Sequence, residues 1–160
     1  MQPLVSFYRG RKEEQVCRLF LRYALTSTLV MSIIALAVCL IMTPALVSIF
    51  IDSSRTVLYN DTIHAFRIYS LCYLVIGYNI VCSGYFAAVE KSRYSFTISL
   101  LRGFVFIAAS IWIMGELFQG EGIWYATLVC ESSTLLVSIG CMLRSRKKTQ
   151  VSSQQVVQQI

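Results

Sequence analysis

The stretch from Tyr23 to Ile51, YALTSTLVMSIIALAVCLIMTPALVSIFI, contains no charged residue. A helix needs about 20 mainly apolar residues to cross a hydrocarbon core that is roughly 30 Å thick, and this stretch is longer. The sequence therefore predicts a membrane-spanning helix here. Pro44 lies near the end of the stretch. Because proline removes a backbone hydrogen bond of a helix, we expect the helix to kink or end at this residue.

Three further apolar stretches follow, over residues 68–89, 96–115 and 122–143. Hydrophobic residues make up 56% of the chain and the mean hydropathy is +0.65, whereas about 45–50% apolar residues is usual for a soluble domain. The stretches also lack the polar stripe of a soluble helix. The predicted fold is therefore an all-α integral membrane protein. Residues 1–148 form one membrane domain with four spans, and residues 149–160 form a flexible cytoplasmic tail.

Basic residues are distributed unequally around the predicted spans. One side of the membrane carries the loop between the first and second spans and the loop between the third and fourth. Of the 14 Lys and Arg residues, only Arg55 and Arg67 fall on this side. Cytoplasmic loops of membrane proteins are enriched in Lys and Arg, so both termini are expected in the cytoplasm, at a plasma membrane or bacterial inner membrane. The net charge of +6 is explained by this topology. The expected partner is the lipid bilayer, and no nucleic acid partner is expected.

Motifs of enzymes and metal sites are missing from the sequence. The six cysteines show no C-x-x-C spacing, which predicts no disulfide framework and no metal site. His64 is the one histidine, and we interpret it as a solvated histidine in the loop after the first span. With no nucleophile triad or phosphate-binding loop either, the chain is not expected to be an enzyme or to hold a cofactor.

Glu131 stands near the middle of the fourth apolar stretch. Ionisable residues at membrane depth are costly, and they are functional candidates by default. Desolvation penalises the charged form of a carboxyl group, so we expect the neutral acid to be favoured. Such a group can exchange a proton or neutralise a cationic substrate. The alternative is a structural role, in which a protonated Glu131 hydrogen-bonds to a neighbouring helix.

Three other polar residues lie inside the apolar stretches. Arg102 is expected either to extend to the cytoplasmic interface, as long basic side chains do, or to form a structural ion pair, with Glu90 as a partner. Tyr78 and Asn79 bring polar groups to the middle of the second span. They are expected to line a polar cavity or to form hydrogen bonds between helices.

Several motifs resemble those of multidrug and toxic compound extrusion (MATE) transporters. Residues 2–10, QPLVSFYRG, are similar to the family's Q-P-L/I-x-S-Y-N-Y-G at the cytoplasmic end of a helix. Residues 83–95, SGYFAAVEKSRYS, are similar to S-G-Y-F-Q-A…G-K-P-R-x-S, with Glu90 and Ser92 in place of the usual Gly and Pro. The resemblance continues with RIYS at 67–70, LLR at 100–102, and GIW at 122–124 followed by Glu131.

The resemblance covers the chain up to about Arg144. It implies helices nine to twelve of a twelve-helix transporter, part of its C-terminal six-helix lobe. Family members export organic cations and other drugs in exchange for sodium ions or protons, by alternating access. The implied partners are therefore a drug-like organic cation, a coupling sodium ion or proton, and a missing N-terminal part of the transporter. Glu131, Tyr78 and Asn79 would contribute to the substrate and ion pathway.

Three alternatives to a drug exporter remain open at this point. One is a lipid-linked oligosaccharide flippase of the same superfamily, although such cavities tend to be strongly cationic and Arg102 is the one base at membrane depth. Another is a small four-helix accessory membrane protein without transport of its own. The last is an inactive truncated product.

Overall fold

The computed structural model describes residues 1–52, 56–118 and 122–158, with side chains up to Ser145. Every regular element in these ranges is helical. The elements in chain order are α1 (Gln2–Gly10), α2 (Glu14–Phe50), α3 (Thr56–Ser70), α4 (Tyr73–Ala88), α5 (Ser92–Leu100), the π-helix η1 (Leu101–Phe106), α6 (Ile107–Phe118) and α7 (Gly122–Gln158).

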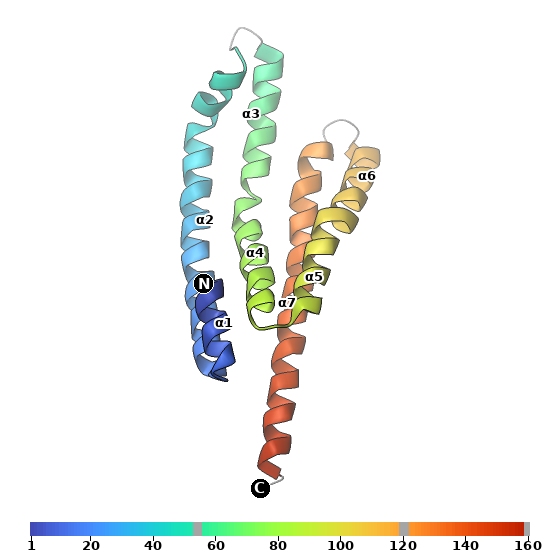
Figure 1. Ribbon diagram of the computed structural model, residues 1–160. Helices are drawn as coiled ribbons and strands as arrows, with labels where there is room; N and C mark the ends of the chain where they lie inside the picture. The colour runs from blue at the N-terminus through green and yellow to red at the C-terminus, as the bar shows by residue number, and fades with distance from the viewer. Residues whose placement is uncertain (53–55, 119–121, 159–160) are drawn as a thin grey trace.

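The helices form two long antiparallel pairs (Figure 1). One pair consists of α2 and the connected helices α3 and α4, and the other of α5 to α6 against α7. Contacts between α4 and α7 join the two pairs, while α1 packs on α2 and α4. The α1–α2 turn and the α4–α5 turn lie toward the same end of the molecule.

Three helical segments are long and apolar enough to cross a membrane, namely α2, α5 to α6, and α7 up to Ser145. The α3–α4 pair qualifies as a fourth if its two bent halves count as one span. The predicted all-α membrane fold is thus confirmed. In the most apolar part of α2 only 11% of the residues are buried, against 33% in α7, so α2 presents most of its surface outward and α7 packs inside.

The first predicted span starts earlier and is more continuous than expected. Helix α2 begins at Glu14 and passes through Pro44 to Phe50, so the helix does not end at the proline. Proline removes one backbone hydrogen bond, and the helical bonds on both sides of Pro44 suffice to continue the helix. Figure 1 shows the last turns of α2 bending toward α3, where Tyr59 Oη donates to the Pro44 carbonyl at 3.0 Å.

The second predicted span, residues 68–89, begins in the last turn of α3 and continues through α4. Helices α3 and α4 meet at an angle of 40°. The hydroxyl of Ser70 donates to the Phe66 carbonyl at 2.7 Å, and such bonds to the preceding turn often bend helices. Tighter backbone bonds, from Leu71 N to Ile68 O and from Cys72 N to Tyr69 O, close the bend.

Helix α3 also corrects the expected loop before this span. His64 lies within α3 and is exposed, so it is a helical residue and not a loop residue. At the other end of the chain, α7 runs on to Gln158, into the segment 149–160 for which the sequence predicted a flexible tail. Residues 159–160 lie outside the described residues.

The apolar core sits where α1, α2, α4, α5 and α7 meet. Its largest fully buried members are Val5, Phe86 and Ile98. Further along, α2 and α4 approach so closely that a Cβ atom on Gly77 would overlap Thr28 Cγ2. A small residue at this position therefore allows the two helices to pack, as is common between membrane helices. The resulting frame holds α4 against α7, and this contact positions the polar residues described next.

Candidate functional site

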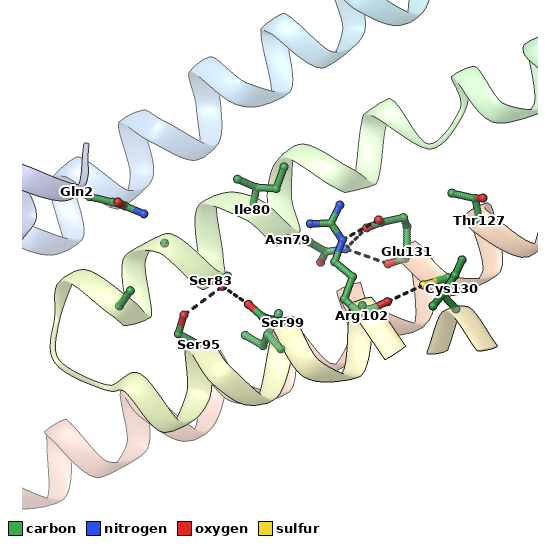
Figure 2. Close-up of a pocket in the computed structure, with 15 residues that line it drawn as sticks. Gln2, Asn79, Ile80, Ser83, Ser95, Ser99, Arg102, Thr127, Cys130 and Glu131 are labelled. Carbon is green, nitrogen blue, oxygen red and sulfur yellow. Dashed lines mark hydrogen bonds and ion pairs between the residues drawn. The ribbon is translucent and has the colours of Figure 1, made fainter. Parts of the chain in front are cut away.

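A cluster of three polar side chains connects α4, η1 and α7 in the middle of the helix bundle. Glu131 of α7 is at the centre, and its side chain is 7% exposed. Arg102 Nε donates to Glu131 Oε1 at 2.8 Å, forming an ion pair. Asn79 Nδ2 donates to Glu131 Oε2 at 2.9 Å and to the Glu131 carbonyl at 3.0 Å. Figure 2 shows the three side chains converging from their different helices.

The amide of Asn79 uses both of its ends. Its NH₂ group has two hydrogens and donates both to Glu131, while its Oδ1 accepts from Ser138 Oγ at 3.2 Å. Among the described residues, no buried side-chain nitrogen or oxygen lacks a hydrogen-bond partner. Both oxygens of Glu131 therefore accept from N–H donors.

The π-helix η1 carries Arg102. The wider turn of a π-helix is rare, and it often occurs at functional sites. It lies at Leu101–Phe106, opposite the turn of α7 that holds Glu131. Here Cys130 Sγ donates to the Arg102 carbonyl at 3.5 Å. Helix α7 therefore binds both the backbone and the guanidinium of Arg102.

A cavity of about 570 Å³ opens beside this cluster. Asn79, Arg102 and Glu131 line its inner end. Three serine hydroxyls line another part, where Ser83 Oγ lies 3.2 Å from both Ser95 Oγ and Ser99 Oγ (Figure 2). The side chain of Gln2, from α1, also reaches the cavity. The cavity thus combines one buried ion pair with neutral hydrogen-bonding groups and apolar walls.

Not every residue that the sequence singled out lies in this site. Asn79 and Glu131 line the cavity, but Tyr78 packs against the apolar core. Neighbouring residues of a helix point about 100° apart, so Tyr78 and Asn79 face different surroundings. Arg102 forms the structural ion pair that was one of its two predicted roles. Its partner is Glu131, and not the exposed Glu90 of the α4–α5 turn.

Sequence reasoning missed Ser138 and the three serines of the cavity. The signal for Ser138 was present, since Glu131, Thr134 and Ser138 follow one another at helical spacing and share one face of α7. Ser95 and Ser99 are likewise four residues apart on one helix face. Gln2 was quoted within a motif, but its position beside the cavity depends on how α1 packs against α4.

Comparisons with known proteins place the chain in a family. The MatE family model matches residues 1–113. This match includes Asn79 and Arg102 and ends before α7, which carries Glu131. Neither the curated proteins nor the solved structures contain a match to the chain. Since the match spans well over half of the chain and agrees with the membrane-type helices, this chain belongs to the MatE family of multi-pass membrane transporters.

Proposed function

We propose that the chain takes part in the export of organic cations, driven by the entry of sodium ions or protons through alternating access. The observation that carries this proposal is the buried carboxylate of Glu131 at the inner end of an open cavity. A fixed negative charge in a low-dielectric site attracts cations strongly. The cavity volume of about 570 Å³ falls within the range of about 300–1,000 Å³ of sites for drug-sized molecules.

The ion pair supports a competitive mechanism. In the structure the counter-ion of Glu131 is the guanidinium of Arg102. An organic cation that enters the cavity competes with Arg102 for this carboxylate. A proton on Glu131 removes the negative charge and so weakens the hold on either cation. A sodium ion prefers oxygen ligands, as hard cations do, and the Glu131 carboxylate offers them. Substrate and coupling ion would thus exclude one another at one site.

The same pairing favours a cationic substrate over a lipid-linked oligosaccharide. A flippase for pyrophosphate-linked lipids needs positive charge in its cavity. The positive charge of Arg102 is compensated by Glu131 at 2.8 Å. The pair carries no net charge, so the cavity lacks the excess positive charge that a pyrophosphate group would need.

We further propose the orientation and the surroundings of the chain. Both the start of α2 and the end of α7 face the cytoplasm, because basic residues gather at this end. The membrane is the plasma membrane, which in bacteria is the inner membrane. The outward surface of α2, with 11% of its apolar part buried, contacts lipid or the other transmembrane segments of a complete transporter.

The test is cation binding and transport by the full chain in lipid vesicles. We expect tetraphenylphosphonium, a model organic cation, to bind, and sodium ions or low pH to displace it. The variant Glu131→Gln removes the charge and keeps the shape, so binding and gradient-driven transport should fall at least tenfold. Glu116→Gln, at an exposed carboxylate of α6, is the matched control and should behave as wild type.

Two separate gradients identify the coupling ion. A sodium gradient at equal pH and a pH gradient without sodium are imposed in turn. The gradient that drives transport identifies the coupling ion. Unchanged binding and transport in a folded Glu131→Gln variant would contradict the proposal. So would equal losses in the Glu131 and Glu116 variants, since the cavity carboxylate would then have no special role.

A further inference from the structure

A second cavity lies at the end of the molecule where α1, the start of α2, the α4–α5 turn and α7 come together. Its volume is about 230 Å³, many times the ~10–15 Å³ that accommodates one water molecule. The charged residues that line it are Arg9, Glu14, Arg18, Arg22 and Lys91. Four basic side chains thus share this cavity with one acidic side chain. We call it the basic pocket.

The single carboxylate of the basic pocket is already shared. Glu14 Oε1 lies 2.9 Å from Arg9 Nη1, and Glu14 Oε2 lies 3.6 Å from Arg18 Nη2. One negative charge cannot balance the three guanidinium groups of Arg9, Arg18 and Arg22. Arg22 forms no ion pair with any residue in the described part of the chain. The lining therefore has an excess of positive charge.

The basic side chains are held in position by different elements. Lys91 Nζ donates to Ser145 Oγ at 2.7 Å, which connects the α4–α5 turn to α7. Arg9 comes from the last turn of α1, whereas Arg18 and Arg22 are one helical turn apart on α2. The phenol of Tyr85 also borders the pocket, and Leu21 and Met142 of the apolar core close its inner wall. Donors from separate helices thus converge on one polar space above an apolar floor.

In the proposed orientation, the basic pocket lies at the depth of lipid headgroups. The uncharged stretch of α2 begins at Tyr23, directly after Arg22. Tyr23 is 65% exposed and Leu19, one turn earlier, is 47% exposed. Tyrosine is enriched at membrane–water interfaces, and basic pockets between helices on the cytoplasmic side bind the headgroups of anionic lipids.

We propose that the basic pocket binds a phosphate group. Arg and Lys form strong charge-assisted hydrogen bonds with phosphate oxygens, and the excess positive charge attracts an anion. The phosphate is carried either by the headgroup of an anionic phospholipid or by a small soluble phosphate ester. The pocket is separate from the cavity at Glu131, and the proposal does not depend on the transported substrate.

The test measures binding to the full chain purified in a neutral detergent. The two probes are a short-chain phosphatidylglycerol and glycerol 3-phosphate, and calorimetry or native mass spectrometry gives each Kd. The pocket variant is Arg22→Gln with Lys91→Gln. The control variant is Arg11→Gln with Arg93→Gln, which removes two exposed charges at the same end but outside the pocket. Both variants lose the same net charge.

We expect the pocket variant to raise the Kd about tenfold or more, because each basic residue near a membrane surface contributes about a fivefold factor. The control variant should change it less than threefold. Binding of phosphatidylglycerol alone would identify a lipid headgroup as the source. Similar affinity for glycerol 3-phosphate would identify a soluble phosphate. Either result supports the phosphate site.

Two results would overturn the phosphate site. One is an equal rise of the Kd in the pocket and control variants, which would indicate that the probes are attracted to surface charge in general. The other is that the wild-type chain binds neither probe. Circular dichroism checks that the variants fold. If the double variant does not fold, the single variant Arg22→Gln, at an exposed position without an ion pair in the described residues, takes its place with Arg11→Gln as its control.

Discussion

The Arg102–Glu131 pair and the Arg9–Glu14 pair have almost the same geometry but very different surroundings. Their N–O distances are 2.8 Å and 2.9 Å. The side chain of Glu131 is 7% exposed, whereas that of Glu14 is 42% exposed. Water and salt screen the exposed pair, so it contributes little to stability. In the other pair the Arg102 side chain is 30% exposed but Glu131 is buried, so the pair is screened less and each partner depends more on the other.

This difference teaches that the two regions respond to change in different ways. In the buried cluster the carboxylate, the guanidinium and the amide of Asn79 form one connected unit. In the basic pocket the charges are numerous and each is at least partly exposed, so water can replace a lost partner. The following predictions test this contrast through the free energy of unfolding, measured for the full chain in lipid–detergent bicelles.

The largest effect is expected from Glu131→Ala. It leaves the guanidinium of Arg102 without its counter-ion at membrane depth, and breaking a buried pair in this way costs about 3–5 kcal/mol. Ser132→Ala, at the neighbouring exposed position of α7, is the control and should change stability by less than about 0.5 kcal/mol. A loss below about 1 kcal/mol for Glu131→Ala would show that water reaches the pair.

A double-mutant cycle measures how strongly the buried partners depend on each other. Replacing both Arg102 by Met and Glu131 by Leu removes both charges, and apolar replacements of a buried pair are often neutral or stabilising. We therefore expect the double variant to be more stable than either single variant, with a coupling energy of about 2–3 kcal/mol. Additive losses would mean that the two residues contribute independently.

Asn79→Ala tests the third member of the cluster. It removes both donors to Glu131 and the acceptor for Ser138, so the expected loss is about 1–3 kcal/mol. Ile80→Ala, at the next and largely exposed position of α4, should lose less. If Asn79→Ala were no worse than Ile80→Ala, the amide would not belong to the connected unit.

The sequence was informative about the spans and less so about the helix ends. A long run without charges is sufficient to predict a membrane helix, as for α2. The polar residues before Ile68 hid the helical character of α3, because hydropathy identifies apolar segments and not helices as such. The bend between α3 and α4 is accompanied by local hydrogen bonds of Ser70, Leu71 and Cys72, which a hydropathy pattern does not reveal.

The candidate site shows the same limit. Asn79, Arg102 and Glu131 each stood out as polar residues in apolar stretches, so the sequence could name them individually. It could not name the pairing, because Arg102 and Glu131 are 29 positions apart and their contact depends on which faces of the helices meet. The prediction of Glu90 as the partner of Arg102 relied on nearness in sequence, and it was wrong.

At the edge of the basic pocket, the α4–α5 turn offers a stabilising change. Glu90 has a backbone φ of 61°, a left-handed conformation that costs roughly 1–2 kcal/mol for residues other than glycine. Glu90→Gly removes this strain. It also makes the unfolded chain more flexible, which lowers the free energy of unfolding by about 0.4–1 kcal/mol. The expected net gain is about 0.5–1 kcal/mol. Ser92→Gly, at the helical start of α5, is the control and should destabilise the chain. A loss of stability in both variants would contradict the presence of backbone strain at Glu90.

The smallest effect is expected from Glu14→Gln, and its salt dependence makes the comparison sharpest. This change removes the partner of Arg9 and Arg18 in the basic pocket, yet exposed pairs contribute only about 0.2–1 kcal/mol. The loss should shrink further when salt rises from about 0.01 M to 1 M, because the screening length falls from about 30 Å to 3 Å. The loss from Glu131→Ala should change less over the same range, because the Glu131 side chain is only 7% exposed and is screened less. Equal salt dependence of the two losses would show that burial does not separate these ion pairs.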